Sequence, residues 1–382
     1  MITKPGIYKI LLGIFLPMLL AGCRFADSTD KTEPVYIVST IANILIKFEE
    51  KPGMDQISQG ISVFGDNAFV TDFFNHVIYR VSLKTGKMEI FAGVLGVAGF
   101  NDGNPGTALF FRPFGILVYN GDLLVADSGN SVIRKISIAT GQVSTFIGKP
   151  GVGGHLNGYA EKATFRFPCG IAIDEKYLYV ADSGNSTLRK VELINRHVST
   201  IAGMAGVAGR VDGTGNAARF NTPKAIATDG KNVYVADTIN GTIRQVVVAT
   251  GEVRTLAGMG FQPGSKDGFG NDSRFNNPLG IAMFGNDLIV ADSGNDNIRK
   301  INIEKKKVTT IAGQQGYNSG CPLLTLYLKI KEESKPEVTS ESANGEGTQT
   351  RFKRPSGITT DGKNIYVIDS RNHQIRMLKQ KE

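Results

Sequence analysis

The chain has 382 residues, of which 41% are hydrophobic, and it carries a formal net charge of +8 at neutral pH. This composition can supply a sizeable core, and beyond the N-terminal segment no apolar stretch is long enough to span a bilayer. The basic residues are spread along the chain and are not interleaved with stacking aromatics, so we expect weak attraction to anionic surfaces and no nucleic-acid partner.

The N-terminal segment has the pattern of an export signal. Lys4 and Lys9 precede a short apolar stretch that ends in Leu20-Ala21-Gly22-Cys23. A basic start, a brief apolar run and small residues are typical of a cleaved signal rather than a membrane span. The last four residues resemble the lipobox of bacterial lipoproteins, although an ordinary signal with an incidental cysteine remains the alternative.

This resemblance implies that residues 1–22 are a lipoprotein signal peptide and that the Cys23 thiol receives lipid. Residues 23–34 would then be a polar tether, and residues 35–382 the body of the protein. We expect the body to be extracytoplasmic and held to a bacterial membrane through lipid on Cys23, with the outer membrane or the cell surface favoured.

One motif recurs six times in this body. An apolar run ends in Asp and, three residues later, a turn Asn, as in Leu-Val-Ala-Asp-Ser-Gly-Asn at 124–130. The first five copies are 55 residues apart and the sixth follows after 77 residues. The six aspartates are Asp72, Asp127, Asp182, Asp237, Asp292 and Asp369. A fixed period of this size predicts a repeat architecture.

Each repeat is predicted to be four short strands. In residues 219–258, four apolar runs are separated by turn residues such as Asp229-Gly230, and none has helical periodicity. We expect the Asp237 carboxylate to accept hydrogen bonds from N–H groups of its own turn, and Asn240 to adopt positive φ. A four-stranded antiparallel sheet repeated around a ring is a propeller blade.

The repeats resemble the NHL repeat, whose pattern of Phe-x-x-Pro-x-Gly-Ile-Ala, Val-Ala-Asp-Ser-Gly-Asn and Ile-Arg is matched closely. The first element is seen at 165–172, 275–282 and 352–358, and the last at Ile133-Arg134, Leu188-Arg189, Ile243-Arg244, Ile298-Arg299 and Ile375-Arg376. The resemblance implies an all-β, six-bladed NHL-type β-propeller with repeats at about 57–93, 110–148, 165–203, 220–258, 275–313 and 352–382. The first copy is the most divergent and has Ser58 where the others have Pro.

The two ends of the body predict how the ring closes. The last repeat stops after its third strand, whereas residues 36–42 near the start repeat the fourth strand of a complete copy. The N-terminal strand should therefore pair into the last blade, which leaves no open edge. An insertion at about 321–343 precedes that blade, and Tyr327 within it is a candidate partner contact.

Five recurring arginines admit two interpretations. Each could pair with a turn Asp or with a carbonyl of the adjacent blade, or together they could form a ring of guanidinium groups facing an acidic peptide, glycan or polyanion. They are Arg134, Arg189, Arg244, Arg299 and Arg376, which together with Tyr327 make up the candidate binding surface.

The glycine-rich linkers carry one recurring acid or amide each. Asp102, Asp212 and Asp267, with Asn157 and Asn344 at the same register, are expected to cap turns. Calcium is the alternative, but each linker offers a single acidic ligand where that ion takes six or more oxygens.

The histidines and cysteines leave further possibilities open. His76, His155 and His373 could share a face and hold zinc. The lyases that cleave peptidyl-hydroxyglycines are similar in fold and use such a metal, but their motif is not matched. Cys169 and Cys321 could form a disulfide, which their spacing does not require.

We therefore expect a lipid-anchored binding or scaffold propeller that recognises a protein, peptide or glycan of the cell envelope, with no cofactor and no catalytic residue predicted. The alternative is a metal-dependent lyase or hydrolase with its site at the mouth of the central channel, for which no acid, base and ligand set is legible.

Overall fold

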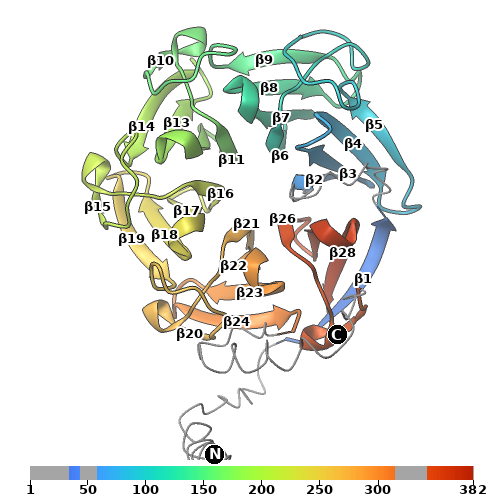
Figure 1. Ribbon diagram of the computed structural model, residues 1–382, viewed down its shortest axis with the longest axis vertical. Coiled ribbons are helices and arrows are strands. Elements are labelled where there is room, and N and C mark those ends of the chain that lie inside the picture. The colour runs from blue at the N-terminus through green and yellow to red at the C-terminus, as the bar shows by residue number, and fades with distance from the viewer. Residues whose placement is uncertain (1–33, 44–57, 315–341, 382) are drawn as a thin grey trace, which may run out of the picture. The chain divides into compact units, whose positions relative to one another are not determined.

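The computed structural model describes residues 34–43, 58–314 and 342–381. From Val35 onward these residues belong to one compact unit, in which six antiparallel sheets are arranged around a central axis (Figure 1). This confirms the six-bladed all-β propeller. Among the described residues there is no helix with the length and apolarity needed to cross a membrane.

Each blade has four main strands, ordered from the channel outward. Blade 1 contains β2 (Ser58–Phe64), β3 (Asn67–Asp72), β4 (Val77–Ser82) and β5 (Met88–Ala92); blade 2 contains β6 (Pro113–Tyr119), β7 (Asp122–Asp127), β8 (Val132–Ser137) and β9 (Val143–Ile147); blade 3 contains β11 (Pro168–Ile173), β12 (Tyr177–Asp182), β13 (Thr187–Glu192) and β14 (His197–Ala202). Blade 4 contains β16 (Pro223–Thr228), β17 (Asn232–Asp237), β18 (Thr242–Val247) and β19 (Glu252–Ala257); blade 5 contains β21 (Pro278–Phe284), β22 (Asp287–Asp292), β23 (Asn297–Asn302) and β24 (Lys307–Ala312); blade 6 contains β26 (Pro355–Thr360), β27 (Asn364–Asp369), β28 (Gln374–Gln380) and β1 (Tyr36–Asn43).

Short elements lie between the main strands. Four linkers add a two-residue strand to the outer edge of the blade that they enter: β10 (Gly158–Tyr159), β15 (Gly213–Thr214), β20 (Gly268–Phe269) and β25 (Gly345–Glu346). Three-residue 3-10 helices occur in the turns as η1 (Ser128–Asn130), η3 (Ser183–Asn185), η5 (Thr238–Asn240), η7 (Ser293–Asn295) and η9 (Ser370–Asn372), and in the linkers as η2 (Ala160–Lys162), η4 (Gly215–Ala217), η6 (Gly270–Asp272) and η8 (Gly347–Gln349).

The N-terminal strand closes the ring as predicted. β1 pairs antiparallel with β28, from Tyr36 opposite Gln380 to Asn43 opposite Gln374. Val38 is buried at 1% exposure, whereas the preceding Ile37 is 42% exposed. The alternation places one face of β1 in the core and joins both ends of the body in one sheet.

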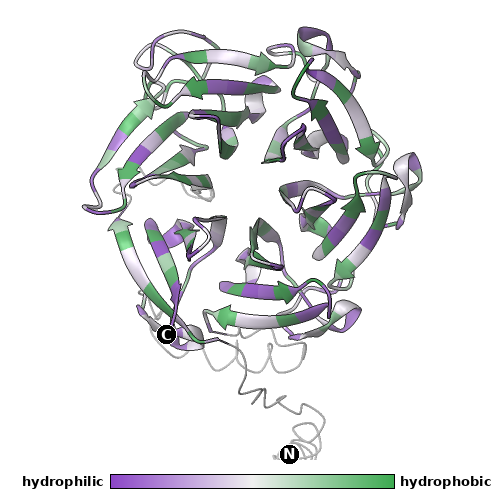
Figure 2. Cartoon of the chain, turned by 180° about the vertical axis from the view of Figure 1, so that it is seen from behind, coloured by the Kyte–Doolittle hydropathy of each residue, from purple (hydrophilic) through white to green (hydrophobic). Residues whose placement is uncertain are grey.

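The core lies between neighbouring blades. Tyr179 of β12 and Val233 of β17, for example, belong to one cluster of buried apolar side chains. Figure 2 shows hydrophobic and hydrophilic residues alternating along many strands of the ring. The second strands, packed on both faces, read instead as continuous apolar runs such as Leu-Val-Ala.

Glycine in the inner strands is explained by the close approach of adjacent blades. A Cβ added to Gly280 of β21 would lie 2.0 Å from the carbonyl oxygen of Ser356 in β26. That distance is far inside van der Waals contact, so any side chain there would push the two inner strands apart.

The turn after the second strand of blade 4 differs from expectation in two details. The Asp237 carboxylate accepts its backbone hydrogen bond from the N–H of Asn221 in the incoming linker, at 2.7 Å, and not from its own turn. Positive φ falls one residue later than predicted, on Gly241 at 62°, while Asn240 lies within η5. The Asp237 side chain thus fixes the linker, and within its own turn it accepts a hydrogen bond from the Asn240 side chain at 2.7 Å.

Candidate binding surface

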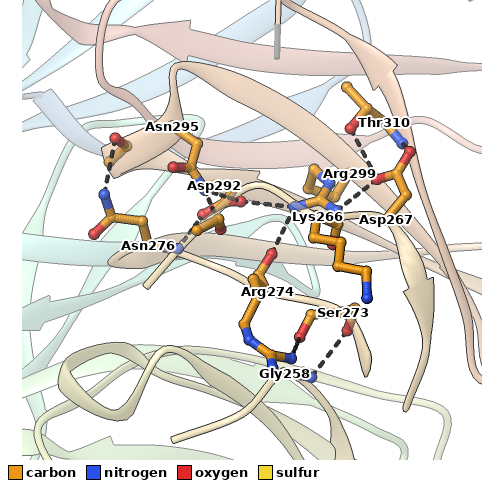
Figure 3. Close-up of polar contacts among 12 residues, drawn as sticks. Gly258, Lys266, Asp267, Ser273, Arg274, Asn276, Asp292, Asn295, Arg299 and Thr310 are labelled. Carbon is orange, nitrogen blue, oxygen red and sulfur yellow. Dashed lines mark hydrogen bonds and ion pairs between the residues drawn. The ribbon is translucent and has the colours of Figure 1, made fainter. Parts of the chain in front are cut away.

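A buried arginine joins the turn and the incoming linker in blades 2 to 6, as Figure 3 shows for blade 5. Nη1 of Arg299 donates to Asp292 Oδ2 and to the Arg274 carbonyl, both at 2.9 Å, and Nη2 donates to Asp267 Oδ1 at 2.6 Å. The guanidinium carbon lies 5.0 Å from the centroid of the Phe275 ring. Nη2 also donates to the Lys266 carbonyl at 3.0 Å, so the arginine's fork holds two carboxylates and two carbonyls in one buried arrangement.

The equivalent arginines of the other blades are held alike, except that Arg189 and Arg376 meet the amide oxygens of Asn157 and Asn344 in place of the linker carboxylate. Arg134, Arg189, Arg244 and Arg376 each lie 2.9 Å from the turn Asp of their blade, and none is more than 1% exposed. This confirms the pairing interpretation. The candidate binding surface formed by the five arginines is wrong, because a partner cannot reach guanidinium groups that are buried and already paired.

The acids and amides of the linkers complete this network. Both Asp267 oxygens accept hydrogen bonds from Thr310 of β24, one from its N–H and one from its hydroxyl, at 3.0 Å. Asp212 bonds in the same way to Thr255, and Asp102 accepts both hydrogen bonds from Thr145 on Oδ2. These side chains therefore tie each linker to an outer strand, rather than capping turns as expected.

Burial weakens the acidity of the turn aspartates. It raises the pKa of Asp127, Asp237 and Asp292 to about 6, although the neighbouring arginine and hydrogen-bond donors act to lower it. The pKa of Asp182 and that of Asp369 are raised in the same direction by burial. Removing a carboxylate from water is costly, and the arginine offsets part of this cost.

A hydroxyl in the turn links each of blades 2 to 5 to the next blade. Thr238 Oγ1 donates to the carbonyl oxygen of Pro278 at 2.8 Å. Ser128, Ser183 and Ser293 donate to the corresponding carbonyls of the blades that follow them. The position after the turn Asp therefore has a structural role in these four blades.

Blade 1 lacks both the buried arginine and the turn hydroxyl. Tyr79 pairs with Val70 in the register where other blades have the arginine, and Phe73 occupies the position of the hydroxyl. Asp72 instead bonds to its own turn, accepting from the N–H groups of Phe74 and Asn75 at 3.1 and 2.9 Å.

The phenylalanine in this turn is the centre of an aromatic cluster. The Phe73 ring centroid lies 5.0 Å from Phe74, 6.2 Å from Phe114 at the start of β6, and 6.1 Å from Phe167, which directly precedes β11. We call these four side chains the Phe73 cluster. Because blades 1 and 3 are not neighbours, Phe73 reaches past the end of blade 2, where the linkers enter the inner strands lining the channel. Phe73, Phe74 and Phe167 are only partly buried.

Two cations lie against this cluster. The Arg112 guanidinium lies 5.5 Å from the Phe73 centroid, and Lys224 Nζ of β16 lies 5.0 and 5.9 Å from the centroids of Phe114 and Phe167. Arg112 is exposed and Lys224 half-buried. This end of the ring, in blades 1 to 4, thus combines apolar ring faces with two positive charges.

The histidine site, which the sequence left open as an alternative, is not formed among the described residues. His76 accepts a hydrogen bond on Nδ1 from the Arg112 N–H at 3.2 Å, His155 is exposed on a linker, and His373 lies near Asp72. Across the part of the chain that the structure describes, no three His, Cys, Asp or Glu residues are grouped to hold a metal ion. Cys23, Tyr327 and Cys321, on which other predictions depend, lie outside the described residues.

The opposite face of the ring carries a groove of different chemistry. Hairpin turns of blades 3, 4 and 5 line a volume of about 1050 Å³ that includes Asp174, Glu175, Asp229 and Glu304. Asp229 is held by Lys231 and Asn232 backbone N–H groups at 2.8 and 2.6 Å. The groove is therefore rich in carboxylates, whereas the Phe73 cluster is apolar and cationic.

The sequence contained a signal for the Phe73 cluster that the repeat alignment concealed. Asp72-Phe73-Phe74-Asn75 matches the turn motif at Asp and Asn, but the other copies have Ser or Thr directly after the Asp where this one has Phe. Phe114, Phe167 and Lys224 occupy variable positions beside the blade-entry Pro, and only the ring geometry brings them together.

Comparisons with known proteins agree with this architecture. No family model matches the chain. NHL repeat-containing protein 2 of Homo sapiens is 29% identical over 289 residues, a match that covers 66% of this chain and 40% of that protein. The chain thus spans less than half the length of this curated relative.

Solved structures show the same fold at low identity. A structural genomics protein of unknown function from Bacteroides thetaiotaomicron aligns over 91% of this chain and 77% of its own, with a TM-score of 0.63 and 16% identity. An auxiliary nutrient binding protein from Bacteroides ovatus aligns over 92% and 78%, with a TM-score of 0.59 and 15% identity. The six-bladed ring and the similarity to NHL repeat-containing protein 2 agree with the resemblance of the repeats to the NHL repeat.

Proposed function

We propose that this protein is a lipid-anchored binding or scaffold propeller that holds a component of the bacterial cell envelope on the Phe73 cluster. The observation that carries this proposal is the cluster itself. Partly exposed aromatic rings gathered with cations at one end of the channel give the propeller no evident structural benefit, whereas aromatic and arginine side chains are the usual anchors of interfaces.

The repeat geometry supports a platform rather than a catalyst. Five blades have their turns and linkers committed to the buried arginine network, which fixes the face on which the cluster lies. Such a rigid frame loses little conformational entropy on binding. One propeller of the same fold is described as a nutrient binding protein, which is consistent with a binding role.

The membrane anchor is the second part of the proposal and rests on Leu20-Ala21-Gly22-Cys23. Cells that make the protein should be fed an alkyne-tagged fatty acid and then fractionated. The wild type should carry the tag and sediment with membranes, whereas Cys23→Ala should lose both properties. A tag that persists in Cys23→Ala would refute the anchor.

Binding is tested by photocrosslinking of the full chain in cells. A benzoylphenylalanine replaces Phe74 in the cluster or, as a matched control, Phe64 in the β2–β3 turn of the same blade, which is 47% exposed. Irradiation should give a discrete adduct with an envelope component from position 74 alone. Phe73→Ser, which restores the residue of the sibling turns, should reduce that adduct. Equal or absent adducts at the two positions would contradict the proposal.

A further inference from the structure

The charges around the Phe73 cluster are not balanced within the described residues. Arg112 and Lys224 contact ring faces there, and neither forms an ion pair with a carboxylate in the part of the chain that the structure describes. An ammonium or guanidinium group over a ring keeps N–H donors that the ring does not satisfy. Both cations are therefore available to an incoming anion.

The turn acids of the blades that carry the cluster cannot supply that anion. Asp72, directly before Phe73, is buried and accepts hydrogen bonds from the Phe74 and Asn75 N–H groups. The turn acids of blades 2 to 4 are paired with the buried arginines. Arg166, which directly precedes Phe167 of the cluster, is exposed and adds further positive charge. An acidic partner would be attracted to this face, and a basic one repelled.

The aromatic rings indicate that the ligand also carries an apolar group. Phe73, Phe74 and Phe167 offer partly exposed apolar faces between the two cations. A neutral glycan would leave both charges without a partner, and a bare inorganic anion would leave the rings in water. A peptide that carries carboxylates beside an apolar side chain satisfies both features.

We infer that the ligand of the Phe73 cluster is an acidic peptide segment of a partner protein, with an apolar side chain on the rings and carboxylates at Arg112 and Lys224. This inference rests on the proposed binding function and narrows it to one class of ligand. Binding should weaken as ionic strength rises, because the cations are at least partly exposed.

The test identifies what is captured. The adduct formed in cells from benzoylphenylalanine at position 74 of the full chain is digested, and the crosslinked fragment is sequenced by mass spectrometry. The expected fragment is a peptide with two or more Asp or Glu residues flanking an apolar side chain. A fragment without carboxylates, a glycan or a lipid would overturn the inference while leaving a binding function in place. No adduct at all would instead contradict the proposed function.

Charge variants provide the second readout. Lys224→Met keeps the aliphatic stem and should lower the adduct yield about tenfold, the effect of losing one charge-assisted hydrogen bond. Lys224→Arg should retain most of the yield, which separates lost charge from lost folding. Lys231→Met, on the opposite face of the same blade, is the matched control and should leave the yield unchanged. Equal yields from the Met variants at 224 and 231 would overturn the role of the cation.

Discussion

Removing one buried arginine should destabilise the propeller strongly. In Arg244→Met, the Asp237 carboxylate would lose its ion pair at 2.9 Å while remaining fully buried, and the carbonyls of Arg219 and Val211 would lose donors at 2.9 and 3.1 Å. Breaking a buried pair from one side typically costs roughly 3–5 kcal/mol, because the remaining charge is unpaired. We expect the free energy of unfolding to fall by about 4 kcal/mol.

The pH dependence of this loss follows from the pKa of Asp237. Burial raises that pKa to about 6, and the charge of Arg244 is the main influence that lowers it. In Arg244→Met the folded-state pKa should therefore rise further. A group with a raised folded pKa loses its stabilising contribution as pH rises through that pKa. The difference in free energy of unfolding between the wild type and Arg244→Met should therefore be larger at about pH 7.5 than at about pH 5.

Guanidinium unfolding followed by circular dichroism at both pH values measures the effect. Arg254→Met in the same blade is the matched control, because that side chain is 66% exposed and its pair with Glu252 should contribute less than about 1 kcal/mol. In Arg244→Met/Asp237→Asn the buried charge is removed, so part of the lost stability should return. A loss below about 1 kcal/mol for Arg244→Met, or no recovery in the double variant, would refute the reasoning.

Three other outcomes follow from the same structure. Gly280→Ala should cost about 3 kcal/mol by overpacking the inner strands, whereas Gly106→Ala, with open space around its Cα, should be nearly neutral in thermal unfolding. Val38→Asp should destabilise the ring by placing a charge in the core beside β28, and Ile37→Asp on the exposed side of the same strand should not; equal melting temperatures would argue against closure by this strand. Because the turn carboxyls have a raised pKa of about 6, the free energy of unfolding should fall as the pH rises from about 4 to about 6, and it should fall less in Asp292→Asn. Identical slopes in the two proteins would contradict the pKa shift.

The fold could be predicted from the sequence because each blade repeats its own local signals. Turn residues after every apolar run and the 55-residue period defined the blades, and the match of residues 36–42 to a fourth strand predicted closure. The partner of Asp237 could not be predicted in this way, because the Asn221 N–H reaches it only after the linker has folded back onto the turn.

The binding surface was mispredicted for a related reason. Recurrence of an arginine is compatible with a shared surface or with a shared internal contact, and the sequence does not state which side of the strand faces the linker. The structure shows Arg244 with a carboxylate on each side and Phe220 beneath it. The arginine that recurs in five blades thus stabilises the blades themselves. A binding site is better sought where one blade differs from the others.

Blade 1 shows how such a difference can be tolerated. Its Thr71 Oγ1 donates to the Phe114 carbonyl of blade 2 at 2.6 Å and accepts from the Gly60 N–H at 2.8 Å. Blades 2 to 5 have Ala at that register and make the link from the turn hydroxyl instead. The contact between blades is thus retained by a side chain two residues earlier, which releases position 73 from that role. A large aromatic residue can then project toward the end of the channel without opening the ring, and for this reason the most divergent repeat is also where the propeller can carry a specific site.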